Sequence, residues 1–121
     1  MKFSAQLPRD FKRQDPNMLA SQRKFSPEHS KEQRLILGAW LRELRETKGL
    51  SQRDLSDALG LEYYTFISQL ENGRGKIPSG RYTDWSTALG QDPKVFVRKL
   101  LMHYDPETYN VLFSESASAH A

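Results

Sequence analysis

Apolar residues repeat with the period of amphipathic helices from residue 26 onward, whereas residues 1–25 show no sustained period. A first helix is predicted to start at Pro27, since proline suits a first helical position, or at Ser30, which opens a capping-box pattern. Gly49 is expected to end this helix. Its predicted buried stripe consists of Ile36, Leu37, Trp40, Leu41 and Leu44.

Four further helices are predicted from the capping residues and glycines that bound them, at residues 52–59, about 63–71, about 81–89 and 93–104. Asp105-Pro106 offers the start of one more short turn. The residues expected to be buried in the first three of these segments are Leu55, Ala58, Leu59, Phe66, Ile67, Leu70, Trp85, Ala88 and Leu89. In the fourth, Phe96, Leu100 and Tyr104 lie on one stripe. No segment alternates as a strand does, so we predict an all-α fold, with a five-helix domain, a disordered N-terminal arm and a short C-terminal tail.

Charge is spread unevenly over the 121 residues, which carry a formal net charge of +3. Residues 1–34 hold eight Lys and Arg against four Asp and Glu, while the other residues hold ten against eleven. We therefore expect a basic, disordered arm over residues 1–28, a domain over 29–91, a C-terminal helix over 92–113 and a disordered tail over 114–121. The excess positive charge belongs to the arm.

Several classes of function are excluded by the residues present. The absence of cysteine excludes disulfide frameworks and thiolate metal sites. His29, His103 and His120 are too scattered to predict a metal site, and the run Gly-Arg-Gly-Lys at 73–76 lacks the spacing of a phosphate-binding loop. No nucleophile, base and orienting group can be matched, so we predict no enzyme activity, no metal and no cofactor.

The location of the protein is predicted from what the apolar runs lack. None approaches the ~20 residues of a membrane span, and the N-terminus has no signal-peptide hydrophobic region. These features favour a cytoplasmic protein without a membrane partner.

The second and third predicted helices are short and are joined by a tight turn. The third predicted helix is polar on its outer face. This pattern is typical of a helix-turn-helix reader of DNA and also of an ordinary helical core. The residues favour the first interpretation. Residues 50–61, LSQRDLSDALGL, and 66–73, FISQLENG, resemble the phage-repressor/Cro family, also called the Xre-type family, and 41–45 and 85–90 resemble its first and fourth helices. The resemblance covers about residues 35–100 and implies a repressor-like, double-stranded-DNA-binding domain of bacterial or phage origin.

The resemblance also implies roles for individual residues. The side chains expected to face the bases are Tyr64, Thr65, Ser68 and Gln69. Those expected to contact phosphates are Gln52, Tyr63, Asn72, Arg74 and Lys76. Arg45 and Glu71 match a structural pair that links the first helix to the end of the reading helix. A glutamine amide can pair with adenine through two hydrogen bonds, which suits Gln69 for reading a base edge.

Two features of the chain depart from a simple transfer of these roles. From Gln52 to Gly73 the chain counts 22 residues, one more than the usual family pattern, and the extra residue falls at the entrance of the reading helix. Either Tyr64 or Tyr63 therefore takes the tyrosine role. The reading helix contains no Lys or Arg, so we expect readout of A·T pairs and of DNA shape rather than an arginine–guanine contact.

The partners and the biological role leave alternatives. Phe96, Leu100 and Tyr104 either complete the core or form a homodimer contact, which would imply an inverted-repeat DNA site. The arm is a solubilising tail, a DNA-contacting arm, or a docking segment for a protein partner within residues 1–25, where Phe3, Leu7 and Phe11 have helical spacing. We expect a transcriptional regulator; the alternatives are an antitoxin with the same DNA-binding module and a helical protein-interaction scaffold.

Overall fold

The computed structural model describes residues 26–114, which form six α-helices and one short 3₁₀ helix and contain no strand. The all-α prediction is confirmed for this part of the chain. Most of the predicted arm, including Phe3, Leu7 and Phe11, and nearly all of the predicted tail lie outside the described residues. Contacts divide the chain between Ser30 and Lys31, and the core described below lies within the second unit, which begins at Lys31. No helix in the described range has the length and apolar character needed to cross a membrane.

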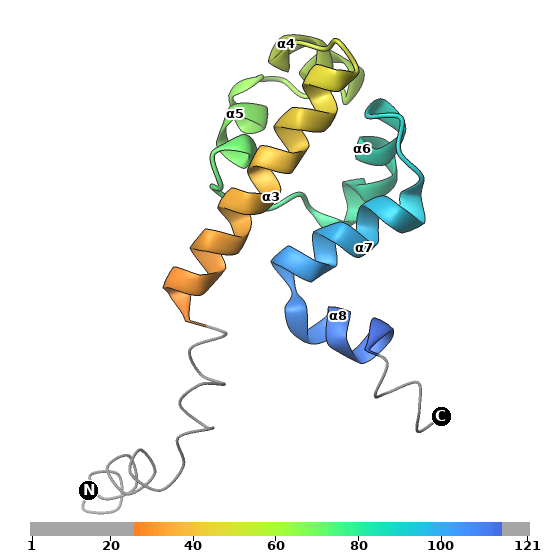
Figure 1. Ribbon diagram of the computed structural model, residues 1–121. Coiled ribbons are helices and arrows are strands. Elements are labelled where there is room, and N and C mark those ends of the chain that lie inside the picture. Colours follow the sequence, from red (N-terminus) through yellow and green to blue (C-terminus); the bar gives the residue numbers. More distant parts are fainter. Residues whose placement is uncertain (1–25, 115–121) are drawn as a thin grey trace, which may run out of the picture. The chain divides into compact units, whose positions relative to one another are not determined.

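The long helix α3 spans Pro27–Thr47 (Figure 1). It begins at the first of the two predicted starts, because the Ser26 hydroxyl accepts a hydrogen bond from the backbone N–H of His29 at 3.2 Å. The helix therefore starts inside the segment 1–28 that was expected to be disordered.

The buried stripe of α3 is rotated relative to the prediction. It consists of Leu37, Gly38, Leu41 and Arg45, whereas Trp40 and Leu44 are only partly buried. Ile36 was wrongly assigned to the core, since its side chain is 48% exposed. A stripe of five apolar residues is wide enough to be centred in more than one way, and the packing partners of α3 determine which centre is buried.

The two short helices are α4, Gln52–Ala58, and α5, Thr65–Glu71. A complete capping box fixes the start of α4: the Ser51 hydroxyl accepts from the Asp54 N–H at 3.0 Å, and the Asp54 carboxylate accepts from the Ser51 N–H at 2.9 Å. The helix was predicted to bury Ala58, which is exposed. Ser56 is buried instead, because its hydroxyl donates to the carbonyl of Leu61 in the following turn at 3.4 Å.

The C-terminal part comprises η1 (Ser79–Arg81), α6 (Tyr82–Ala88), α7 (Pro93–Tyr104) and α8 (Pro106–Phe113). The bounds of α7 are those predicted, since the Asp92 carboxylate caps the helix through the Lys94 N–H at 2.8 Å and Pro93 follows. The predicted short turn after Asp105 is a helix of eight residues. Helix α7 packs against α6 on one side and α8 on the other (Figure 1).

One hydrophobic core joins α3 to α7. Its buried members are Leu37, Leu41, Leu55, Leu59, Ile67, Leu70, Ile77, Trp85, Leu89, Phe96, Leu100 and Tyr104. The proposed dimer contact at Phe96, Leu100 and Tyr104 is corrected by this packing, because these side chains are 0%, 0% and 9% exposed within a single chain. They complete the core, and a second subunit cannot reach them.

Candidate nucleic-acid interface

Helix α5 separates its side chains between two faces. Ile67 and Leu70 are buried in the core, whereas Thr65 and Gln69 are exposed and Ser68 is partly exposed. Residues spaced by three and four lie on the same face of a helix, so Thr65, Ser68 and Gln69 form one outward polar surface. The structure therefore brings together three of the four residues expected to face bases.

The fourth, Tyr64, lies just before this helix. The predicted start of α5 at residue 63 was wrong, because the helix begins at Thr65 and Tyr64 has helical dihedral angles without a side-chain cap. The additional residue lengthens the turn between α4 and α5 instead of the helix. Tyr63 and Tyr64 are 66% and 38% exposed, so both rings are accessible at the entrance of α5.

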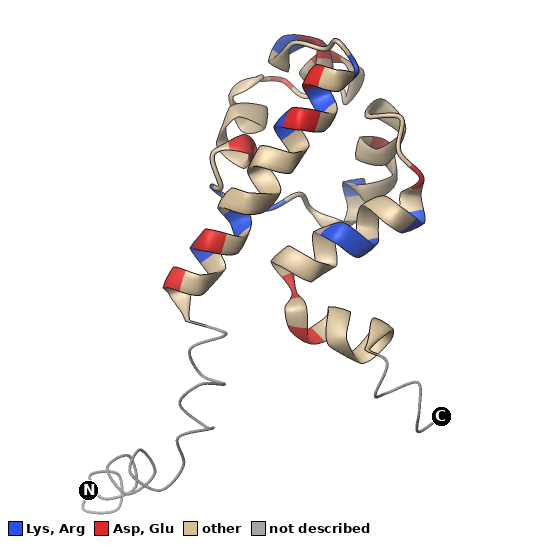
Figure 2. Cartoon of the chain, viewed as in Figure 1, with Lys and Arg blue, Asp and Glu red and all other residues tan. Residues whose placement is uncertain are grey.

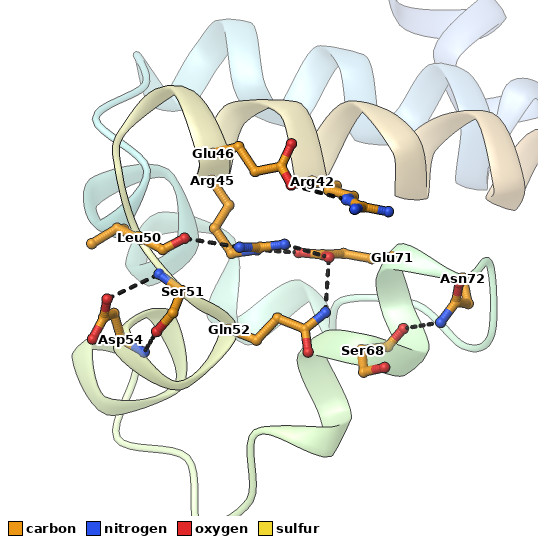
Figure 3. Close-up of polar contacts among 10 residues, drawn as sticks. All are labelled: Arg42, Arg45, Glu46, Leu50, Ser51, Gln52, Asp54, Ser68, Glu71 and Asn72. Carbon is orange, nitrogen blue, oxygen red and sulfur yellow. Dashed lines mark hydrogen bonds and ion pairs between the residues drawn. The ribbon is translucent and has the colours of Figure 1, made fainter.

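A buried ion pair fixes the far end of α5. The Arg45 guanidinium on α3 donates to both carboxylate oxygens of Glu71, from Nε at 2.6 Å and from Nη2 at 3.0 Å (Figure 3). Its remaining nitrogen, Nη1, donates to the carbonyl of Leu50 at 2.8 Å. The two side chains are only 9% and 5% exposed. The hydrogen bonds from Arg45 to Glu71 raise the pKa of Arg45, against the opposing effect of burial.

Gln52 belongs to the same network. Its side-chain Nε2 donates to Oε1 of Glu71 at 3.1 Å, which orients the amide at the start of α4 (Figure 3). An amide NH₂ group has a second hydrogen, so one donor of Gln52 is available for another acceptor. The contact thus connects an expected phosphate-binding residue to the ion pair that holds the reading helix.

The loop after α5 is organised by a left-handed glycine. Gly73 has φ +77°, its N–H donates to the carbonyl of Leu70 at 3.1 Å, and the Arg74 N–H donates to the carbonyl of Gln69 at 2.8 Å. These two bonds make the Schellman motif that closes many helices. The Asn72 side chain donates to the Ser68 carbonyl at 2.9 Å and remains exposed (Figure 3).

Two cations near this loop make contacts that the sequence did not predict. Arg34 on α3 donates from Nε to the Gly73 carbonyl at 3.2 Å, a contact that only the continuation of the buried stripe toward residue 34 could have suggested. Lys76 is exposed, and its Nζ donates to the carbonyl of Tyr104 at 3.1 Å. Its contact with a phosphate stays a prediction. A cation at the C-terminal end of a helix is favoured by the helix dipole, so Lys76 anchors the loop to α7. Arg74 is exposed.

Tyr104 anchors the same loop from the other side. Its hydroxyl accepts a hydrogen bond from the buried N–H of Ile77 at 3.3 Å. Burial raises the pKa of Tyr104 to about 12, although the bond from Ile77 opposes this shift. The residue is therefore a structural element of the core.

Arg53 was not singled out in the sequence. The carbon at the centre of its guanidinium lies 4.6 Å from the centre of the Tyr64 ring, which is cation–π distance. No spacing rule predicts this contact, because it depends on the path of the turn between the two helices.

The interface is nearly uncharged along the reading helix. Figure 2 shows α5 without a basic residue, and its one acidic residue, Glu71, is paired with Arg45. Within residues 26–114 no group of three His, Asp or Glu side chains is placed to hold a metal ion. The arrangement offers polar side chains for hydrogen bonding at its centre and arginines at its two ends.

Comparison with known proteins agrees with this geometry. A family model described as a helix-turn-helix domain matches residues 36–95, which include α4, α5 and α6. The match is consistent with the resemblance to the phage-repressor/Cro type and indicates a DNA-binding regulator. No curated protein sequence matches the chain significantly.

Proposed function

Residues 36–95 belong to the helix-turn-helix family, and on that basis we propose that the chain is a sequence-specific transcriptional regulator that binds double-stranded DNA. Helix α5 enters the major groove and α4 lies across the DNA backbone, as in this motif generally. One observation carries the proposal. The outer face of α5 is polar and accessible, while its inner face is packed in the core and its C-terminal end is fixed by the Arg45–Glu71 pair.

The contacts to bases come from the outer face of α5. Gln69 is exposed and makes no hydrogen bond from its side chain to any other described residue, so its amide is available for adenine N6 and N7. The methyl group of Thr65 suits the methyl group of thymine, and Ser68 can hydrogen-bond either kind of base. A site dominated by A·T pairs and by DNA shape follows, since α5 has no Lys or Arg.

Phosphate contacts set the position of the helix on DNA. Gln52 serves the start of α4, and Asn72 and Arg74 serve the loop after α5. Tyr63 lies at the entrance of α5. Contacts of this kind fix register and orientation and carry little sequence information.

We extend the proposal to a homodimer on an inverted repeat, with residues 92–113 as the contact region. Its support is a set of exposed apolar side chains on α7 and α8: Val95, Met102, Val111, Leu112 and Phe113. Contact with a second copy of the chain would remove these side chains from water, which is favourable for apolar groups. A two-fold dimer requires half-sites about one turn of DNA apart, roughly 34 Å.

Selection of bound DNA from a random-sequence pool by the full chain tests the proposal. We expect an enriched motif that is rich in A·T pairs and has two-fold symmetry. Enrichment of a motif without symmetry would contradict the homodimer and still support sequence-specific DNA binding. If the pool yields no enriched sequence, the protein-interaction scaffold is favoured over a DNA-binding regulator.

The role of Gln69 is tested on the enriched site. We expect Gln69→Ala to weaken binding there by about 1–3 kcal/mol and to change binding to mixed-sequence DNA much less. Thr87→Ala, which removes an exposed polar side chain from α6, is the control and should leave both affinities unchanged. Equal weakening on both DNAs would show that Gln69 does not read a base.

A further inference from the structure

The exposed pair Arg53–Tyr64 connects the beginnings of the two short helices. Arg53 lies in the first turn of α4, and Tyr64 directly precedes α5. The guanidinium is 4.6 Å from the ring centre, and the ring is 38% exposed. In a helix-turn-helix domain the beginning of the second helix points into the groove while the first helix crosses the backbone. The pair is therefore located where a phosphate next to the groove would lie.

Among the described residues, no acidic side chain forms an ion pair with this guanidinium. Asp57 and Glu62 line the same small hollow of about 150 Å³ as Arg53 and Tyr64, but the contact that Arg53 makes is with the Tyr64 ring. Stacking on a ring uses the flat face of a guanidinium and leaves its N–H edge able to donate. The orientation of Arg53 thus depends on an aromatic contact instead of a carboxylate.

Three other cations near α5 do not serve this position. Helix α5 has no basic residue, Lys76 is held by the carbonyl of Tyr104, and Arg45 is buried with Glu71. Arg74 is exposed, but it follows the opposite end of α5. Arg53 is the exposed cation at the entrance of the helix.

We propose that Arg53 binds a DNA phosphate at the entrance of the reading helix and that Tyr64 is its positioning residue. This inference rests on the proposed DNA-binding function and names a contact of that same site. It moves Tyr64 from the base-contacting set to a role in holding the guanidinium. An arginine fork can donate two parallel hydrogen bonds to a phosphate, and a fork already held by a ring loses less side-chain freedom on binding.

The salt dependence of binding tests the proposal. Binding of the full chain to a fluorescent 30-base-pair duplex of mixed sequence, and to a duplex carrying the selected site, is measured between about 50 and 200 mM KCl. We expect Arg53→Gln to reduce the slope of log K against log salt by about 0.9 on both duplexes, because one phosphate contact is lost. A wild-type slope in this variant would overturn the proposal.

A matched control lies in the same chain. Arg42 on α3 is also an exposed arginine, but it is paired with Glu46 and lies outside the residues proposed to contact DNA or a second subunit. Arg42→Gln removes the same charge and should leave the slope unchanged. If it lowers the slope as much as Arg53→Gln, the effect is one of net charge and the assignment of Arg53 is wrong.

The positioning role is tested by variants of Tyr64. Tyr64→Phe keeps the ring and should bind as the wild type does. Tyr64→Ala should weaken binding about 2- to 5-fold with little change in slope, since the charge of Arg53 remains and only its orientation is lost. In an Arg53→Gln background, Tyr64→Ala should have no further effect; an undiminished effect would show that Tyr64 acts independently of Arg53.

These measurements distinguish failure of the DNA-binding function from failure of the Arg53 assignment. If the wild-type chain binds neither duplex, the DNA-binding function itself fails. If it binds and Arg53→Gln changes neither slope nor affinity, the function stands and only the assignment of Arg53 is lost. Both residues are exposed, and thermal unfolding of each variant checks that the fold is retained.

Discussion

Arg45 and Glu71 illustrate how single residues of this chain connect the core to the reading helix. Each has charged atoms that burial removes from water, and each has its hydrogen-bonding groups satisfied by the other or by Leu50 and Gln52. A buried ion pair adds little net stability compared with apolar residues, but removal of one partner leaves an uncompensated buried charge. The pair is therefore sensitive to single substitutions.

Substitution of the carboxylate tests this interpretation. We expect Glu71→Gln to lower the free energy of unfolding by about 3–5 kcal/mol, because Arg45 loses its compensating charge while remaining buried. Urea denaturation of the full chain measures the change.

An exposed ion pair on α3, the helix that carries Arg45, is the control. Nε of Arg42 lies 3.1 Å from Oε2 of Glu46, but the two side chains are 63% and 55% exposed. Glu46→Gln should therefore change the free energy of unfolding by less than about 0.5 kcal/mol. Equal effects of the two substitutions would mean that burial does not determine the importance of these ion pairs.

At the scale of elements, α3 and α5 approach each other closely enough that only glycine fits between them. A Cβ atom at Gly38 would lie 2.5 Å from the carbonyl oxygen of Glu71 and 2.6 Å from that of Leu70. Both neighbours are backbone atoms at the end of α5, which a change of rotamer cannot relieve. The same crossing brings Arg45 against Glu71.

The substitution Gly38→Ala tests this close packing, because we expect it to change the free energy of unfolding in the direction opposite to the usual one. In an exposed helix interior, alanine is more stable than glycine by about 1 kcal/mol. Here we expect a net loss of about 1–3 kcal/mol, since overpacking forces the backbone of α5 to move. Thermal or urea unfolding measures the change, with Gly80→Ala as a control in open space. A stabilised Gly38→Ala protein would refute the close packing of α3 and α5.

The elements also show what could be predicted before the structure. Helix α7 was predicted with its bounds because Asp92-Pro93 is a local signal that needs no tertiary partner. The stripe of α3 was misplaced because its centre contains Gly38 and Arg45, which are buried only through their contacts with α5. Local patterns determine helices well, whereas helix rotation depends on neighbours.

In the candidate site too, local positions on a helix could be predicted, whereas contacts between elements could not. The outward position of Gln69 could be inferred by counting back from the end of its helix. The anchoring of Lys76 and the stacking of Arg53 could not, because they depend on the paths of loops between helices.

At the scale of the whole molecule, α3 and α7 are joined by a partly buried polar contact. Nδ1 of His103 lies 2.7 Å from Oε1 of Gln33, so Nδ1 carries the proton of the neutral ring. Nε2 is buried and has no hydrogen-bond partner among the described residues. Burial lowers the pKa of His103, and the nearby charge of Lys99 lowers it further.

The lowered pKa predicts a pH-dependent stability. The unfolded chain binds a proton at His103 near pH 6.5 while the folded protein resists it, so folding is favoured above that pH and is weakened as the pH falls through 6.5 toward the folded pKa. Between pH 7.5 and 5.5 this residue should contribute a slope of at most ~1.4 kcal/mol per pH unit. Urea denaturation of wild type and His103→Gln across this range measures the slope. The substitution should remove this component, and identical profiles would contradict it.

The two-faced arrangement of α5 has a consequence for how such a protein can change its target. The core includes Ile67 and Leu70, which are buried. It does not include the outward side chains of Thr65, Ser68 and Gln69. Under the proposed function, DNA recognition and folding occupy interleaved but separate positions of one seven-residue segment. Exchange of the three outer side chains could retarget the domain to other operators without loss of the fold, so new specificities are accessible to evolution, and to an engineer, by few substitutions.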